Sequence, residues 1–285
     1  MIAETPVTFG RHESLVGVWC APERDAASVP AAVFINAGII HRVGPGRLHV
    51  HMARALAAAG FPSLRFDLGG LGDSVASRAE RGTVLEWVKR DIRDAIDYAA
   101  ARGSGRVVLV GLCSGADNAI DVAPDDPRVV GLVLLDPNVH RTRAFRMHHF
   151  LRAARSPQTW RLLVTGRHPV LRRLGRRNRR PADSAPATPF LAPSTLPPRE
   201  LLEQRLHGLT ERGCRLFYFF TGGLPFRYNH ARQFARTFPR LPYGSAVEVH
   251  YRGDWDHTFS DPQAQATLIE SVREWFARVQ NPRAA

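Results

Sequence analysis

Residues 107–115 read VVLVGLCSG, and this stretch decides the fold. Four apolar residues form a short strand, and a glycine stands two positions before and two positions after Cys113. A nucleophile between a strand and a helix projects from a very tight turn, which leaves no room for side chains at those two positions. The spacing therefore predicts that Cys113, held between Gly111 and Gly115, is a nucleophile at a strand–helix turn.

Ser114 is the competing nucleophile in the same turn. Its neighbours at two-residue spacing are Leu112 and Ala116, and the Leu112 side chain is too bulky for that role. The register therefore favours Cys113, and the N-terminus of the following helix would stabilise its thiolate. The alternative is a buried cysteine in a glycine-rich turn without any chemistry, because short motifs also match by chance.

Strands and helices alternate on both sides of this turn. We expect a β-hairpin over 6–22, strands at 31–35, 62–66, 106–110, 129–135, 216–220 and 246–251, and helices at 48–59, 83–102, from 116, at 230–238 and at 262–279. Such alternation is typical of parallel βαβ units, and unbroken apolar strands are typical of a sheet that is covered on both faces. The sequence thus predicts an α/β fold with a mixed, mostly parallel sheet.

Residues 138–210 differ in character from the rest of the chain. Between residues 138 and 182 there are thirteen Arg and no Asp, Glu or Lys, which equals the whole net charge of +13. A proline-rich linker would be one interpretation. Apolar residues at helical spacing, such as those around Trp160, instead favour a helical cap inserted into a core domain of residues 1–137 and 211–285.

Two further motifs support a resemblance to a known superfamily. Residues 67–74 read DLGGLGDS, and residues 36–45 read NAGIIHRVGP. With the turn at Cys113, they resemble the α/β-hydrolase superfamily, in particular the serine-aminopeptidase-like branch and the bacterial hydrolases associated with exosortase loci. The resemblance implies an eight-stranded sheet. With a cysteine in this turn, the chain also resembles dienelactone hydrolases and polyhydroxyalkanoate synthases, which use a Cys-Asp-His triad.

The resemblance also implies a general base and an acid that orients it. His257 follows the last predicted strand and precedes the last helix, where the base of this fold comes. The loop at 221–227, where the acid usually stands, carries no carboxylate. Asp136, at the end of the strand after the turn, is therefore the candidate acid, although it could simply cap the next turn. Asp254 and Asp256 are local alternatives.

An oxyanion hole requires two backbone N–H groups near the nucleophile. One is expected from Ser114, which follows Cys113, and the other from Ile39 in the loop after the strand at 31–35. The residues expected to contact the substrate are Gly38, which allows close approach of the backbone, His41, Arg42 and Leu224.

These residues together predict acyl transfer through an acyl-Cys113 intermediate, with His257 as base and then acid. The acceptor is either water or an alcohol or amine, so hydrolase and acyltransferase stay open. Small acyl donors, including donors carried by coenzyme A or an acidic acyl-carrier protein, would suit the arginines. A solvated basic helix face is an equally good interpretation of them. A catalytically inactive binding or scaffold protein is the alternative function.

The composition argues against several other classes of protein. Cys20, Cys113 and Cys214 form no C-x-x-C pair, so a zinc site is not expected, and neither is any other metal or cofactor. No nucleic-acid module is recognisable, and no run reaches the ~20 apolar residues of a membrane span. The first residues lack the features of a signal peptide, which predicts a cytoplasmic protein. A homodimer is compatible with all of this.

Overall fold

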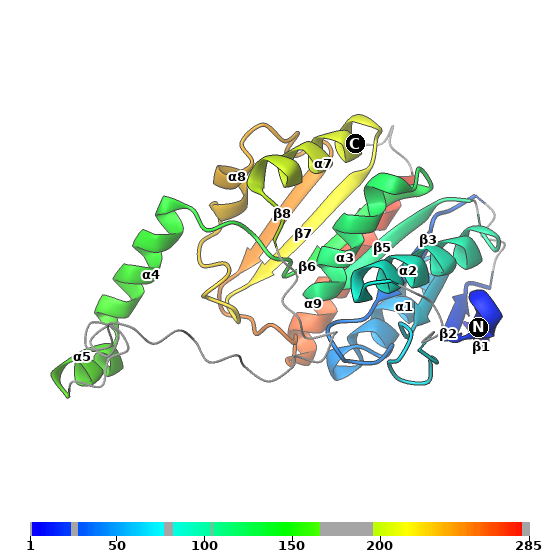
Figure 1. The fold of residues 1–285 in the computed structure, drawn as a ribbon, viewed down its shortest axis with the longest axis horizontal. Helices are drawn as coiled ribbons and strands as arrows, with labels where there is room; N and C mark the ends of the chain where they lie inside the picture. Colours follow the sequence, from blue (N-terminus) through cyan, green and yellow to red (C-terminus); the bar gives the residue numbers. More distant parts are fainter. Residues whose placement is uncertain (1, 24–27, 77–81, 104, 166–195, 281–285) are drawn as a thin grey trace.

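A computed structural model describes residues 2–23, 28–76, 82–103, 105–165 and 196–280. Its centre is one eight-stranded sheet in the order β1-β2-β4-β3-β5-β6-β7-β8 (Figure 1). The strands are β1 (Ala3–Phe9), β2 (Leu15–Ala21), β3 (Ala31–Ile35), β4 (Ser63–Phe66), β5 (Val107–Leu112), β6 (Val129–Leu135), β7 (Arg215–Thr221) and β8 (Val247–Arg252). β1 pairs antiparallel with β2, and β2 pairs antiparallel with β4. All the other neighbouring strands are parallel. The predicted mixed, mostly parallel sheet is confirmed.

Helices cover both faces of this sheet. The helices are α1 (Leu48–Ala58), α2 (Val84–Ala100), α3 (Ser114–Val122), α4 (Arg143–Arg155), α5 (Pro157–Val164), α7 (Arg199–Glu211), α8 (Gln233–Thr237) and α9 (Pro262–Gln280). α1 and α9 pack on one face, whereas α2, α3, α7 and α8 pack on the other. The strands between them are apolar on both sides because neither face meets water.

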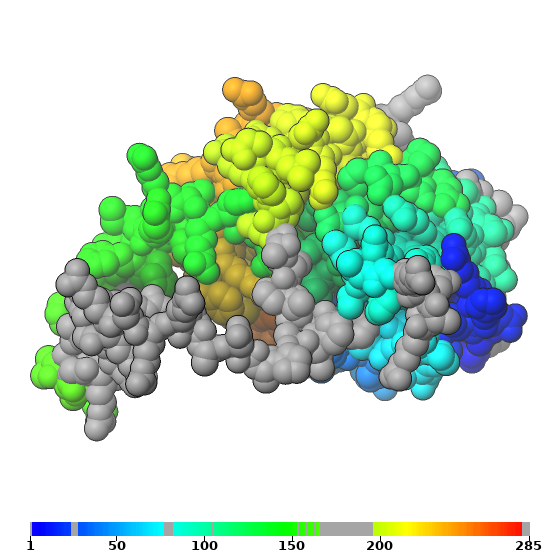
Figure 2. All heavy atoms as spheres, in the orientation of Figure 1, coloured from blue at the N-terminus to red at the C-terminus, as the bar shows by residue number. Residues whose placement is uncertain are grey.

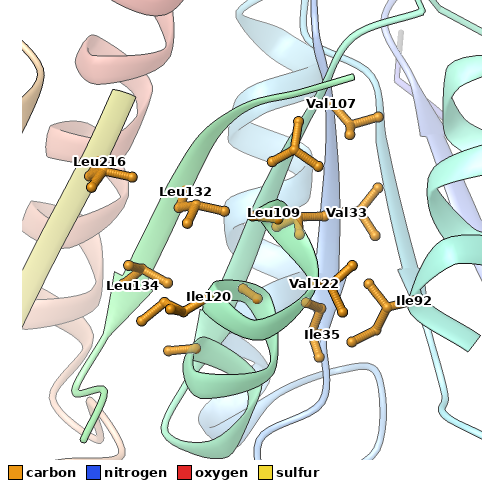
Figure 3. Packing of buried hydrophobic residues seen from close by; sticks show 14 of the residues in the cluster. Val33, Ile35, Ile92, Val107, Leu109, Ile120, Val122, Leu132, Leu134 and Leu216 are labelled. Carbon is orange, nitrogen blue, oxygen red and sulfur yellow. The ribbon is translucent and has the colours of Figure 1, made fainter. Parts of the chain in front are cut away.

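The packing around β5 shows why these residues form these elements. Val33, Leu109 and Leu132 lie on neighbouring strands and are fully buried. They point toward α2 and α3, as Figure 3 shows, and Ile92 and Ile120 of these helices close the layer from outside. Each such buried side chain stabilises the fold by roughly 1.5–3 kcal/mol relative to an exposed one. The position of Cys113 is therefore fixed by the central strand of a well-packed core.

The insertion after β6 consists of two different parts. Residues 199–211, which the sequence assigns to the cap, form α7 and pack on the sheet through buried Leu202, Leu206 and Leu209. α4 and α5 instead extend away from the sheet (Figure 1). Residues 166–195 lie outside the described residues, so a lid over the site stays a prediction.

Candidate active site

Cys113 stands at the point where β5 ends and α3 begins. Its backbone has φ 56° and ψ −120°. Residues other than glycine rarely adopt this conformation, which costs about 1–3 kcal/mol. Its N–H donates to the Leu135 carbonyl at 2.8 Å, which ties the turn to β6. A strained turn that presents one side chain is typical of a nucleophile.

The two glycines of this turn are required by close backbone contacts. A Cβ on Gly111 would overlap the backbone of Gly115. A Cβ on Gly115 would lie 2.7 Å from the Asn36 carbonyl oxygen and 2.8 Å from that of Ile35. The helix α3 therefore crosses the ends of β3 and β5 without any side chain between them, which is the physical reason for the glycine spacing around Cys113.

Asp136 and His257 lie together at the carboxyl ends of the parallel strands. The buried Asp136 carboxylate accepts the Thr221 N–H at 2.7 Å on Oδ1 and the Thr221 hydroxyl at 2.6 Å on Oδ2. Its Oδ2 also lies 2.8 Å from Nδ1 of His257. With Nδ1 held by a carboxylate, Nε2 is the ring nitrogen left for Cys113. Of the sequence alternatives, Asp256 is bound by the backbone and hydroxyl groups of its neighbours Thr258 and Ser260.

The charged forms of Cys113 and His257 stabilise each other. Burial lowers the pKa of His257, but hydrogen bonds to Asp136 and to Cys113 outweigh it and raise that pKa to about 9. Burial raises the pKa of Cys113, but hydrogen bonds from His257 and Arg227 outweigh it and lower that pKa. The two groups titrate as a pair. Near neutral pH this arrangement favours a thiolate facing an imidazolium.

Arg227 is a member of the site that the sequence analysis does not identify. Its Nη1 lies 3.4 Å from Sγ of Cys113. The loop that carries it is held by the Arg227 N–H, which donates to the Leu224 carbonyl, and by Nε2 of Gln233, which donates to the Arg227 carbonyl, both at 2.8 Å. One feature of the sequence could have pointed to Arg227: it lies in the loop after β7, and β7 ends at the same edge of the sheet as β5.

The first two residues of the same loop, Gly222 and Gly223, have no room for side chains. A Cβ on Gly222 would overlap the Gly253 carbonyl, and one on Gly223 would overlap the backbone nitrogen of His257. The start of the loop is therefore packed directly on the segment that carries His257. Thr221, a second residue that the sequence analysis does not identify, holds Asp136 through its N–H and its hydroxyl.

The sequence assigns the oxyanion hole to the backbone amides of Ser114 and Ile39, and this assignment stays a prediction. Within the described parts of the chain, the N–H groups of Ser114 and Ile39 donate to no protein acceptor. The Gly38 N–H donates to the Ser114 hydroxyl at 2.8 Å, so this side chain fastens the loop after β3 to α3. The geometry gives Ser114 a positioning role through its hydroxyl and leaves its amide available.

The remaining expected substrate contacts differ in their surroundings. His41 is exposed, Gly38 is half-buried with open space where a Cβ would stand, and Leu224 lies in the Arg227 loop. The guanidinium of Arg42 forms ion pairs with the buried Asp67 and, at 2.7 Å, with Asp73. Arg42 thus joins the two loops that resemble family motifs, and it has less freedom to bind a substrate than the sequence suggests.

The described residues contain no group of three or more His, Cys, Asp or Glu side chains that could hold a metal ion. None of the helices formed by these residues has the length and apolar character needed to cross a membrane.

Comparisons with known proteins identify the fold. No protein-family model and no curated protein matches the chain. Among solved structures it resembles a Pyrococcus furiosus esterase (14% identity, TM-score 0.59, 99% of this chain and 92% of that one). It also resembles a dienelactone hydrolase from Anabaena variabilis (13%, 0.56, 97% and 98%) and a thioesterase domain from the curacin biosynthetic pathway (15%, 0.57, 95% and 99%). The chain has the α/β-hydrolase fold.

Proposed function

We propose that this protein is a cysteine-dependent acyl ester or thioester hydrolase or acyltransferase. The observation that carries the proposal is the hydrogen-bonded series from Thr221 through Asp136 to His257, which ends at Cys113 in the strained turn. This series supplies a nucleophile, a base and an orienting acid in the roles that acyl transfer requires. The esterase, dienelactone hydrolase and thioesterase among the structural neighbours support the same class of reaction.

The proposed reaction has two halves. The Cys113 thiolate attacks the acyl carbonyl, and the amides of Ser114 and Ile39 bind the oxyanion of the tetrahedral intermediate. When the carbonyl re-forms, the bond to the leaving alcohol or thiol breaks, and the leaving group takes the proton from His257. His257 then removes a proton from water, an alcohol or an amine, which attacks the acyl-Cys113 thioester. Collapse of the second intermediate releases the product and regenerates the thiolate.

A thiolate nucleophile makes thioesters attractive donors, since the sulfur that attacks and the sulfur that leaves have similar basicity. We therefore include small acyl donors carried by coenzyme A or by an acyl-carrier protein in the proposal. Cytoplasmic location and a homodimer stay predictions of the sequence. An inactive scaffold is the competing function, and it requires that Cys113 does not react with acyl donors.

An acyl-thioester probe tests the proposal directly. We expect covalent labelling of the wild-type protein, none of Cys113→Ala, and unchanged labelling of Cys20→Ala, which removes a buried thiol far from the turn. Ser114→Ala should keep the acyl-enzyme and lose activity only several-fold, because the hydroxyl holds the loop of Gly38 and does not attack. Labelling that survives Cys113→Ala but disappears in Ser114→Ala would refute the mechanism. A folded wild type that never labels would favour the scaffold.

A further inference from the structure

The helices α4 and α5 carry an apolar surface that faces away from the protein. In α4, Met147, Phe150, Leu151 and Ala154 follow one another at three- and four-residue spacing, so they share one face of the helix. Met147 is 59% exposed and Phe150 is 67% exposed. Large apolar side chains exposed side by side in this way usually mark an interaction site.

The other face of α4 is the one that contacts the body of the protein. Phe145 is buried there, and its carbonyl accepts a hydrogen bond from Nδ2 of Asn229 at 3.0 Å. The ring of His148 stacks on that of His230 with 4.8 Å between centroids. Since Phe145 and His148 anchor the helix on this side, the stripe from Met147 to Ala154 is left facing outward.

α5 extends the apolar surface. Its Trp160 and Val164 are four residues apart, and they are 56% and 86% exposed. The indole Nε1 of Trp160 donates to the Ala154 carbonyl at 2.6 Å, which places the ring beside the end of the α4 stripe. We call the surface formed by Met147, Phe150, Leu151, Trp160 and Val164 the α4–α5 surface.

Four exposed arginines lie around this surface, and in the part of the chain that the structure describes none of them pairs with an acidic residue. Arg146 and Arg155 flank the stripe on either side, Arg143 precedes it, and Arg161 lies on α5; all are exposed. Residues 137–182 contain no Asp or Glu, and within the described residues no carboxylate forms an ion pair with these four arginines. The combination of apolar residues, a tryptophan and flanking arginines is typical of helices that lie in the interface of an anionic bilayer.

We propose that the α4–α5 surface docks the protein on an anionic phospholipid bilayer. The two helices protrude from the body of the molecule, as Figure 1 shows, and in Figure 2 the visible green atoms of this segment lie at one end of it. A bilayer receives such a convex apolar surface without a shaped counterpart, whereas a protein partner would have to supply a complementary groove. The phosphate groups of the lipids would pair with the arginines while the apolar side chains enter the acyl boundary. The proposal is independent of the chemistry at Cys113.

Sedimentation with lipid vesicles tests the proposal. The full-length protein should bind vesicles of phosphatidylcholine and phosphatidylglycerol in equal amounts, bind phosphatidylcholine alone far less, and lose affinity as salt is raised. Phe150→Asp should reduce the partition coefficient at least about tenfold, since it removes an inserted aromatic ring and adds a charge that the lipids repel. Leu85→Asp is the matched control, because Leu85 is 48% exposed on α2 and lies outside the α4–α5 surface.

A second pair of variants separates local charge from total charge. Arg146→Gln with Arg155→Gln should weaken vesicle binding, whereas Arg93→Gln with Arg273→Gln, which lowers the net charge equally on α2 and α9, should not. In addition, a vesicle-induced change in tryptophan emission should disappear in Trp160→Phe. All variants should keep the melting temperature and the turnover of a small soluble ester.

Three kinds of result would overturn the proposal. The first is binding that lacks the expected charge dependence: no binding of the wild-type protein to anionic vesicles, or equal weakening of that binding by both arginine pairs. The second is a dimer in light scattering that Phe150→Asp dissociates without any vesicle binding, which would assign the surface to a second copy of the chain. The third is binding to polyglutamate but not to vesicles, which would assign it to an acidic polypeptide.

Discussion

Asp136→Asn tests the proposed orienting acid of the site, because it changes one oxygen of that side chain and little else. Both carboxylate oxygens of Asp136 are acceptors: Oδ1 receives the Thr221 N–H, and Oδ2 receives the Thr221 hydroxyl and faces Nδ1 of His257. An asparagine has only one acceptor oxygen, and its NH₂ group must face one of these donors. The variant therefore loses the charge beside His257 and leaves a buried donor without a partner.

The structure sets the size of both effects. The pKa of His257 is raised from 6.5 to about 9, which corresponds to about 3 kcal/mol in favour of the imidazolium, and the hydrogen bond to Asp136 is its largest favourable cause. If about 2 kcal/mol of this is lost, kcat/KM falls about thirtyfold. The unpaired buried donor costs a further 1–3 kcal/mol, roughly, of folding free energy.

The assay is the pH dependence of Cys113 alkylation and of ester turnover, measured beside thermal unfolding. The midpoint of Cys113 alkylation should move up by more than about one pH unit, because a neutral imidazole no longer stabilises the thiolate. Asp254→Asn, which removes a charge from an exposed residue three positions before His257, is the control and should leave the midpoint in place. The reasoning fails if Asp136→Asn destabilises the protein but keeps the wild-type midpoint, or if Asp254→Asn produces the larger shift.

Three further variants follow from the same contacts. Arg227→Gln should raise the pKa of Cys113, so that activity falls most at low pH and recovers as pH rises; an unchanged profile would deny Arg227 a role in stabilising the thiolate. Gly115→Ala should destabilise the fold by more than about 3 kcal/mol in urea unfolding, because its Cβ would press on the Asn36 carbonyl, while Gly208→Ala, where the space is open, should not. His49 is buried, and burial lowers its pKa to about 4. Between pH 6.5 and 4 the unfolded chain therefore binds a proton at His49 that the folded protein does not bind. The free energy of unfolding falls by about 3 kcal/mol over this range. His49→Phe should flatten this acid loss in urea unfolding at pH 7 and pH 4.5, and an equally steep loss would point to other groups.

The sequence predicts the central part of the fold because apolar strands and glycine spacing are local signals. The strand at 31–35 agrees with β3 residue for residue, and the turn at Cys113 occurs where the glycines place it. Helix α3 begins at Ser114, two residues earlier than expected, because the strained turn leads directly into the helix. Helix α8 is shorter than the expected 230–238, since His230 to Arg232 form a turn before it.

What the sequence could not give depends on contacts between distant residues. Arg42 is expected to contact a substrate, but its ion pair with Asp67 joins positions 25 apart in the chain. Arg227 contacts Cys113 across 114 positions, from a loop whose path is set by Gln233 and by the glycines next to Thr221. The loop after β7 carries no carboxylate but does carry the positive charge of Arg227, which a pattern based on carboxylates does not detect.

In the proposed mechanism, the position of Asp136 just after β6 bears on why the nucleophile is a cysteine. Asp136 contacts Nδ1 of His257 from the end of β6, whereas the loop after β7 brings Arg227 to the sulfur of Cys113. Carboxylate, imidazolium, thiolate and guanidinium then alternate in sign along one line of contacts. A cation beside the nucleophile lowers the pKa of a thiol into the working range of an enzyme, but a serine hydroxyl is far too weak an acid to be ionised in this way. The proposed mechanism therefore joins the absent carboxylate after β7, Arg227 in the same loop and the cysteine at position 113 in one arrangement, in which a thiolate faces an imidazolium near neutral pH.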